Sequence, residues 1–131
     1  MKTLATLLAG AALALAGSTA ALARNAEQNE AKLARMLEGR TAGEPVNCIS
    51  ALNSNRIEVI EHVGIVYDSG DTIYVARPSD PRQLGRDDVV VIDRHGGQLC
   101  HNDVIRTIDR YQGFTTGAVF LDNFVPYSKQ D

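Results

Sequence analysis

The sequence predicts a mostly β protein: a small antiparallel barrel or roll of about six strands, with a helix before it and a signal peptide before the helix. Short β-branched or aromatic runs alternate with turn residues from Pro45 onward, which is typical of antiparallel sheet. Helical spacing marks the segment before Pro45, and the first 23 residues have the three parts of a secretory signal. We therefore divide the chain into a signal peptide (1–23), a helix with its linker (24–44) and a β-rich domain (45–131).

The signal peptide is predicted from Lys2, an apolar run rich in leucine and alanine, and the cleavage motif Ala21-Leu22-Ala23. The run is about a dozen residues long, shorter than the roughly 20 residues that span a bilayer comfortably. An uncleaved membrane anchor is the alternative. Cleavage after Ala23 leaves a chain of single-domain length, which we expect in the periplasm or outside the cell, without insertion into the membrane.

Charge and composition argue against one class of partner. The whole chain has a net charge of −3, and removal of Lys2 with the signal peptide makes it −4. Its basic residues are scattered singly, and it contains no tryptophan. Nucleic-acid binding normally requires a basic patch or stripe, so we exclude it as a function.

The two cysteines, Cys48 and Cys100, are predicted to form a disulfide. In an exported protein a cysteine pair indicates a cross-link rather than metal or redox chemistry. The two residues are 52 positions apart. The chain-entropy model gives about 4 kcal/mol of stabilisation for a loop of that length.

Helical spacing over 26–40 predicts a helix that lies against the domain; a disordered N-terminal arm is the alternative. Strands are predicted at 56–61, at 64–67 and 72–77 around a four-residue turn, at 89–92, at 118–121 and at 124–127. We expect 89–92 to be central, because it is the most apolar strand, and 124–127 to be an edge, because it contains Pro126. The segment 102–111 fits either a helix or a strand, and its β-branched residues favour the strand.

One group of residues has the composition of a metal site: Asp93, His95, His101 and Asp103. Imidazole and carboxylate are ligands of zinc and its neighbours. The alternative is a polar turn with exposed histidines, because the spacing matches no established ligand pattern. Convergence requires that the chain after Gly96-Gly97 folds back beside strand 89–92.

Other polar groups indicate no chemistry. The segment 68–71, Asp-Ser-Gly-Asp, lacks the remaining ligands of a calcium loop, so we interpret it as a turn. Asp87 and Asp88 are adjacent and would point to opposite faces of a strand, which makes a poor acid/base pair. His62 is expected in a turn, facing solvent. The sequence therefore predicts no catalytic residue, no cofactor-binding residue and no cofactor.

Several short motifs recur in an order that resembles a group of small exported proteins from Gram-negative bacteria, classed as a domain of unknown function. They are Cys48-Ile49, Arg56-Ile57, Ile73-Tyr74-Val75 with Arg77-Pro78, Leu99-Cys100 with Asp103-Val104, and Phe124-Val125-Pro126-Tyr127. The resemblance covers about residues 45–128. It implies an exported, small β-rich fold and no activity. Members often have further cysteines where this chain has 81–85 and 118–121, so their disulfide pattern does not transfer.

These observations favour a non-catalytic binding or structural module over an enzyme. Its partner would be a protein or a cell-envelope ligand of unknown identity. A small metal-binding protein or metal-dependent hydrolase that uses Asp93, His95, His101 and Asp103 is the alternative function.

The export prediction is tested by the mature N-terminus. Because the cleavage motif ends at Ala23, protein recovered from the periplasm should begin at Arg24. Intact-mass spectrometry measures this directly. Recovery of periplasmic protein that retains Met1 would contradict the prediction, whereas a start shifted by one to three residues would only move the site.

Overall fold

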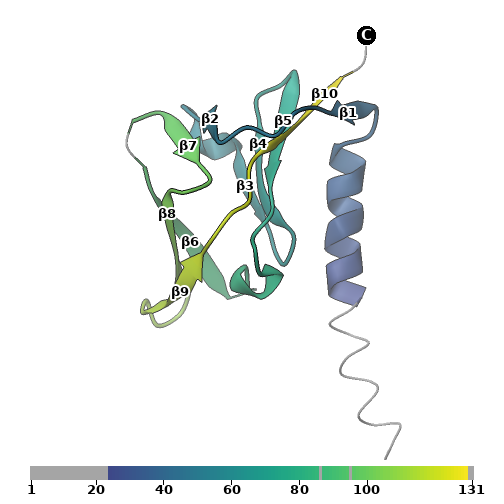
Figure 1. The fold of residues 1–131 in the computed structure, drawn as a ribbon. Helices are drawn as coiled ribbons and strands as arrows, with labels where there is room; N and C mark the ends of the chain where they lie inside the picture. The colour runs from purple at the N-terminus through teal and green to yellow at the C-terminus, as the bar shows by residue number, and fades with distance from the viewer. Residues whose placement is uncertain (1–23, 86, 95, 130–131) are drawn as a thin grey trace, which may run out of the picture.

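A computed structural model describes residues 24–85, 87–94 and 96–129. The predicted signal peptide lies outside these residues. A helix over 24–36 precedes the strands and the 3₁₀ turns (Figure 1). In chain order these are β1 (Arg40–Ala42), β2 (Cys48–Ser50), η1 (Ser54–Arg56), β3 (Ile57–Ile60), β4 (Gly64–Asp68), β5 (Thr72–Ala76), η2 (Pro81–Gln83), β6 (Asp88–Asp93), β7 (Gln98–Cys100), β8 (Val104–Asp109), β9 (Thr115–Val119) and β10 (Val125–Lys129). Within the described ranges, no helix is long and apolar enough to cross a membrane.

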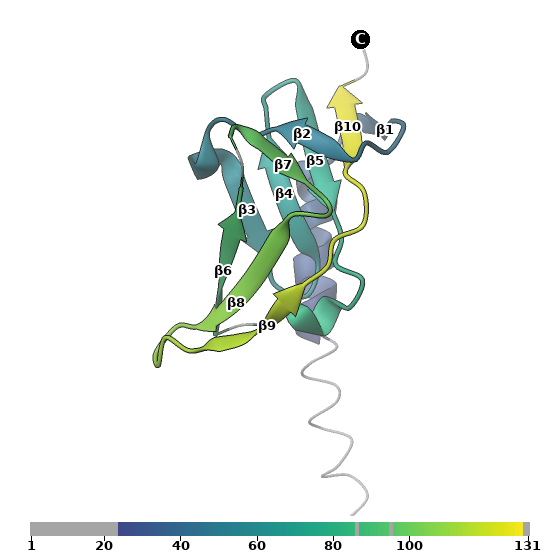
Figure 2. The same ribbon diagram turned by 60° about the vertical axis from the view of Figure 1, so that its left-hand side comes forward.

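The strands form three antiparallel sheets. A five-stranded sheet has the order β1-β10-β5-β4-β3, a three-stranded sheet has the order β6-β8-β9, and β2 pairs with β7. Figures 1 and 2 show the helix on one side of the five-stranded sheet and the two smaller sheets on the other. The fold is therefore mostly β with one N-terminal helix, as predicted. The prediction of a barrel was wrong, because the described sheets are not closed, and the number of strands is ten instead of about six.

Each face of the five-stranded sheet has its own core. On the helix side, Leu33 packs with Val66 of β4 and with Ile73 and Val75 of β5. On the other side, a larger cluster joins the sheets; its members are Ile49, Ala51, Ile65, Tyr67, Ala76, Leu84, Leu99, Ile105, Val119, Leu121 and Phe124. Successive side chains of a strand point to opposite faces, so β4 and β5 contribute to both cores.

The helix is attached to the sheet by polar contacts as well as by Leu33. Glu30 forms a two-pronged ion pair with Arg77, with its closest N–O distance at 2.7 Å. This carboxylate raises the pKa of Arg77. The side-chain amide of Asn29 donates to the carbonyl oxygen of Glu61 at 2.9 Å. The helix thus lies against the domain, as its apolar stripe predicted.

The predicted hairpin at 68–71 is confirmed. Asp68 Oδ1 accepts the Gly70 N–H at 2.8 Å, and the Ser69 N–H donates to the Thr72 carbonyl at 3.0 Å. Gly70 has a φ of 99°, a left-handed conformation that favours glycine. The segment 102–111, for which helix and strand were both open, contains strand β8.

Two predicted strand positions were wrong. β6 was expected to be central but is an edge strand of its sheet. β10 was expected to be an edge but lies between β1 and β5. Pro126 is tolerated there because its carbonyl accepts the Gly43 N–H at 2.7 Å, on the side facing β1 and just beyond the end of that strand. The N–H that proline lacks would point to that same side, so β5 loses no hydrogen bond.

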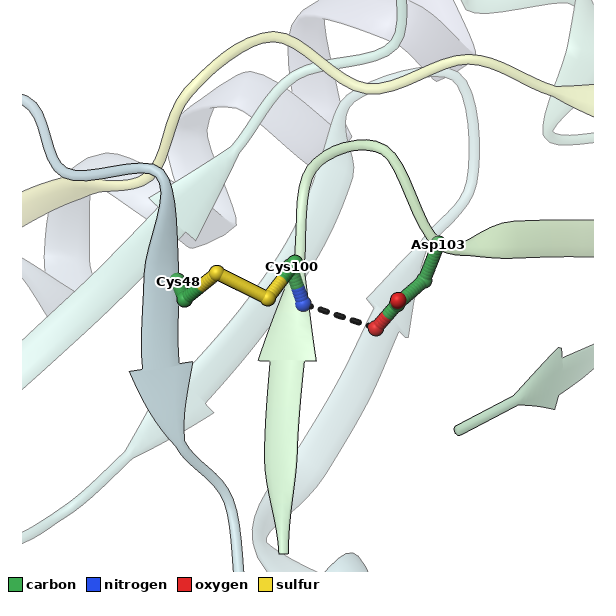
Figure 3. Close-up of a disulfide and its surroundings, with 3 residues drawn as sticks. All are labelled: Cys48, Cys100 and Asp103. Carbon is green, nitrogen blue, oxygen red and sulfur yellow. Dashed lines mark hydrogen bonds between the residues drawn. A yellow bond between two sulfur atoms is a disulfide. The ribbon is translucent and has the colours of Figure 1, made fainter. Parts of the chain in front are cut away.

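The predicted disulfide is present. Cys48 and Cys100 are direct cross-strand neighbours on β2 and β7, with Cα atoms 4.0 Å apart (Figure 3). These two strands have only three residues each. A ladder this short is marginal by itself, so the covalent bond and the buried side chains of Ile49 and Leu99 keep the pair together.

Reduction of the disulfide should destabilise the domain. Breaking a cross-link between residues 52 positions apart increases the conformational entropy of the unfolded state. This lowers the free energy of unfolding by about 4 kcal/mol. We expect calorimetry to show a melting temperature lowered by about 15 °C or more. The double variant Cys48→Ser/Cys100→Ser should melt like the reduced protein and should not respond to reductant. An equal melting temperature with and without reductant would contradict this expectation.

Gly64 should be intolerant of alanine. A Cβ added there would lie 2.6 Å from the Ala76 carbonyl oxygen, so the central β4–β5 ladder would have to shift. We expect a loss of about 1–3 kcal/mol in the free energy of unfolding, measured with denaturant. Gly117→Ala is the matched control, because its Cβ would meet Thr107 Oγ1 at 3.6 Å, an ordinary contact. Equal stability of the two variants would contradict the argument.

Candidate functional site

The structure describes three of the four residues of the predicted metal site, and each has a different setting. Asp93 Oδ2 lies 3.2 Å from Arg106 Nη2 on the outer face of the three-stranded sheet. His101 lines a different hollow, with Pro45 and Leu121. His95 lies outside the described residues.

Asp103, the fourth candidate ligand, is engaged in a turn. Its Oδ2 accepts the Cys100 N–H at 2.8 Å, and its own N–H donates to the Cys100 carbonyl at 3.1 Å (Figure 3). The turn connects the disulfide-bonded strand β7 to β8. Over the ranges that the structure describes, no group of three or more His, Cys, Asp or Glu side chains is arranged to hold a metal ion.

The remaining candidates for chemistry are also engaged. Cys48 and Cys100 are bonded to each other, so neither supplies a thiolate nucleophile. His62, in the β3–β4 turn, has a φ of 60°, and its Nδ1 lies 3.3 Å from the Pro81 carbonyl oxygen. The backbone N–H of His62 donates to the Leu84 carbonyl oxygen at 3.0 Å. His62 therefore ties the turn to η2 instead of standing alone in solvent as predicted.

A polar cleft, which sequence analysis did not identify, lies where η2 meets the three-stranded sheet. Its volume is about 450 Å³, and it is lined by Asp80, Arg82, Gln83, Asp88, Thr107, Thr116, Gly117 and Ala118. Except for Gly117 and Ala118, every lining residue has a polar side chain. The cleft is therefore suited to hydrogen bonding more than to apolar ligands.

One wall of the cleft is η2, whose conformation is set locally. Asp80 caps its start by accepting the Arg82 N–H at 3.0 Å, and Pro81 occupies the first turn. The Arg82 guanidinium also bonds both carboxylate oxygens of Asp80, at 3.1 and 2.9 Å, which lowers the pKa of Asp80. Gln83 Oε1 accepts the Phe120 N–H at 3.4 Å and connects this wall to the end of β9.

The floor of the cleft is a chain of hydroxyl groups that ends at a carboxylate. Thr107 is only 3% exposed and is the one buried polar residue of the described ranges. Thr116 Oγ1 lies 2.7 Å from Thr107 Oγ1 and 2.9 Å from Asp88 Oδ1. Because a hydroxyl has one proton and Asp88 only accepts, Thr116 donates to Asp88 and Thr107 donates to Thr116.

A β-bulge brings the Thr116 hydroxyl into hydrogen-bonding contact with Thr107 and Asp88. Thr107 pairs with Gly117 and Ile108 pairs with Thr115, so Thr116 is the extra residue of β9. A bulge re-aims a side chain that strict alternation would direct elsewhere. Gly85 leaves room for Asp88, since a Cβ at Gly85 would lie 2.8 Å from Asp88 Oδ2.

Thr116 lies beside a carboxylate, and not beside an imidazole or an amine, in the described part of the cleft. A threonine nucleophile needs a neighbouring base that is itself held by a third group. Here the acceptor next to Thr116 is the carboxylate of Asp88, and the described lining contains no histidine or lysine. Asp88 lines the cleft, whereas the adjacent Asp87 is exposed and does not line it.

The chain was compared with protein-family models, with curated proteins and with solved structures, and none of the three comparisons returned a match.

Proposed function

We propose that this chain is an exported, non-catalytic binding module and that its ligand lies in the polar cleft. The observation that carries the proposal is the chain of hydroxyl groups from Thr107 through Thr116 to Asp88. Burial of a polar side chain costs free energy unless it is hydrogen-bonded, and an apolar residue at Thr107 would avoid that cost. The presence of a buried threonine hydroxyl at this position therefore indicates that the cleft is organised around polar groups.

The groups on the walls suit a ligand rich in hydroxyl groups. Asp88, Gln83 and the threonines offer acceptor oxygens, while Arg82 and Gln83 offer donors. A sugar hydroxyl both donates and accepts, so it can bond to either kind of group. A glycan of the cell envelope therefore matches the cleft in chemistry and also matches the compartment predicted from the signal peptide.

The disulfide supports the location. Disulfides persist in oxidising compartments such as the periplasm and the extracellular space. The Cys48–Cys100 bond is compatible with either place. A structural module without a ligand is the alternative within this proposal, and the experiment below separates the two.

The proposal predicts binding of an envelope glycan at the cleft. Soluble muropeptides, added to ¹⁵N-labelled oxidised residues 24–131, should shift the amide signals of 80–88 and 116–118 in heteronuclear NMR spectra. Thr116→Val removes the hydroxyl that joins Thr107 to Asp88 and that can itself bond to the ligand. The loss of one such bond to the ligand should weaken binding by about threefold to tenfold.

Thr115→Val is the matched control, because its side chain is exposed on the same strand and is not part of the cleft. It should bind like the unchanged protein, and the NMR spectrum of each variant reports whether it is folded. Absence of shifts with muropeptides, or equal binding by Thr116→Val, would contradict a glycan-binding cleft and favour the structural module.

A further inference from the structure

Strand β6 has an open edge. The pairs between β6 and β8 run from Asp88–Asp109 to Asp93–Val104, and the Arg110 N–H donates to the Asp87 carbonyl at 2.9 Å. Hydrogen-bonded pairs alternate in an antiparallel ladder, so Val89, Val91 and Asp93 bond to β8. The N–H and C=O groups of Asp88, Val90 and Ile92 therefore point away from β8. Among the described residues, no strand pairs with this side of β6 (Figure 2).

The middle of this edge lacks the usual protection against pairing. Natural edge strands are short, are bulged, or carry proline or charged side chains, including charges that point inward. The charged residues of β6, Asp88 and Asp93, lie only at its two ends, and the four residues between them are apolar. β6 has six residues, Asp-Val-Val-Val-Ile-Asp, and its pairing with β8 is regular throughout. By comparison, the edge strand β1 of the larger sheet has three residues. Five of the eight exposed large apolar side chains of the described ranges also lie on this sheet, on its turn or directly after β9: Val89, Val104, Tyr111, Phe114 and Phe120.

We infer that β6 pairs with β6 of a second copy of this chain, antiparallel about a two-fold axis at Val91. The residues whose backbone N–H and C=O groups point outward have even numbers. Each hydrogen-bonded pair across the axis must therefore join an even-numbered residue of one copy to an even-numbered residue of the other. Two such registers use most of the strand. One is centred on Val90, and the other is centred on Val91.

Charge selects between the two registers. Centring on Val90 places Asp93 opposite Asp87 of the second copy, and like charges directly opposite are destabilising. Centring on Val91 instead places Asp88 opposite Arg94 of the second copy, an opposite-charge pair, and Val90 opposite Ile92. The Arg94 guanidinium bonds to the Ala51 carbonyl, and Asp88 faces the cleft; both side chains lie on the inner side of the sheet.

The register gives Val91 a unique position, because it faces the same residue of the other copy. Non-hydrogen-bonded pairs have Cα atoms about 4.5 Å apart, so the two side chains are in contact. The result is a continuous six-stranded sheet with the order β9-β8-β6 followed by its two-fold equivalent. The dimer is expected with or without a glycan in the cleft.

The test measures the oligomeric state of oxidised residues 24–131 by light scattering and sedimentation. We expect a dimer for the unchanged protein. Val91→Lys and Val91→Glu should each raise the dimer dissociation constant by about tenfold or more, because each places like charges opposite each other. Mixing the two variants should restore the dimer through a Lys–Glu pair.

Val104→Lys is the matched control, since Val104 is 60% exposed on the same face but lies on β8, away from the edge. It should remain dimeric. A monomeric unchanged protein would overturn the inference, as would a Val91→Lys protein that dimerises normally. A mixture of Val91→Lys and Val91→Glu that stays monomeric would overturn it as well. If the mixture does dimerise, misfolding is excluded as the cause of the loss in the single variants.

Discussion

The structure depends on the β4–β5 hairpin, because both cores are built on its two faces. Val66, Ile73 and Val75 face the helix, while Ile65 and Ala76 face the smaller sheets, and each of these side chains is at most 3% exposed. At about 25 cal/mol per Å² of apolar area, each of the buried valine and isoleucine side chains contributes about 1.5–3 kcal/mol. Neither the helix nor the smaller sheets could bury an apolar face without this hairpin, so the three-stranded sheet that carries the cleft depends on it for stability.

The smaller sheets need a second constraint, and the disulfide supplies it. β7 lies in sequence between β6 and β8, and Cys100 fixes it to β2. The turn at Asp103 fixes the start of β8 relative to β7, because Asp103 forms hydrogen bonds with both the N–H and the carbonyl oxygen of Cys100. β8 carries Thr107. The covalent bond thus positions the floor of the cleft through one turn, although neither cysteine touches the cleft.

Local patterns predicted the local parts of this fold. The turn at 68–71 and the strands on either side of it follow from short-range signals: turn residues with a glycine, and alternation. The disulfide follows from the presence of two cysteines in a chain with a predicted signal peptide. Three-residue strands such as β1 and β7 are too short for a period-two pattern to be recognised. Strand neighbours are a long-range property, which is why the positions of β6 and β10 were predicted wrongly.

The apolar run of β6 shows why such a position is ambiguous. Val90 and Ile92 pack on the inner core, and Val89 is 43% exposed on the outer face. A strand buried on both faces and a strand with one exposed apolar face have the same sequence pattern. The cleft was missed for a related reason. Thr116 enters it only because of the bulge in β9, and alternation from Val119 gives no sign of that bulge.

Asp88 connects the proposed binding site with the proposed association. Its carboxylate accepts from Thr116 in the cleft, while its backbone N–H and C=O belong to the open edge of β6. Pairing of that edge with a second copy would hold the backbone of Asp88 from both sides and so reduce the freedom of the carboxylate. A ligand that bonds to a side chain already fixed loses less conformational entropy on binding. Dimerisation and binding would then favour each other, since a coupling free energy between two sites acts in both directions.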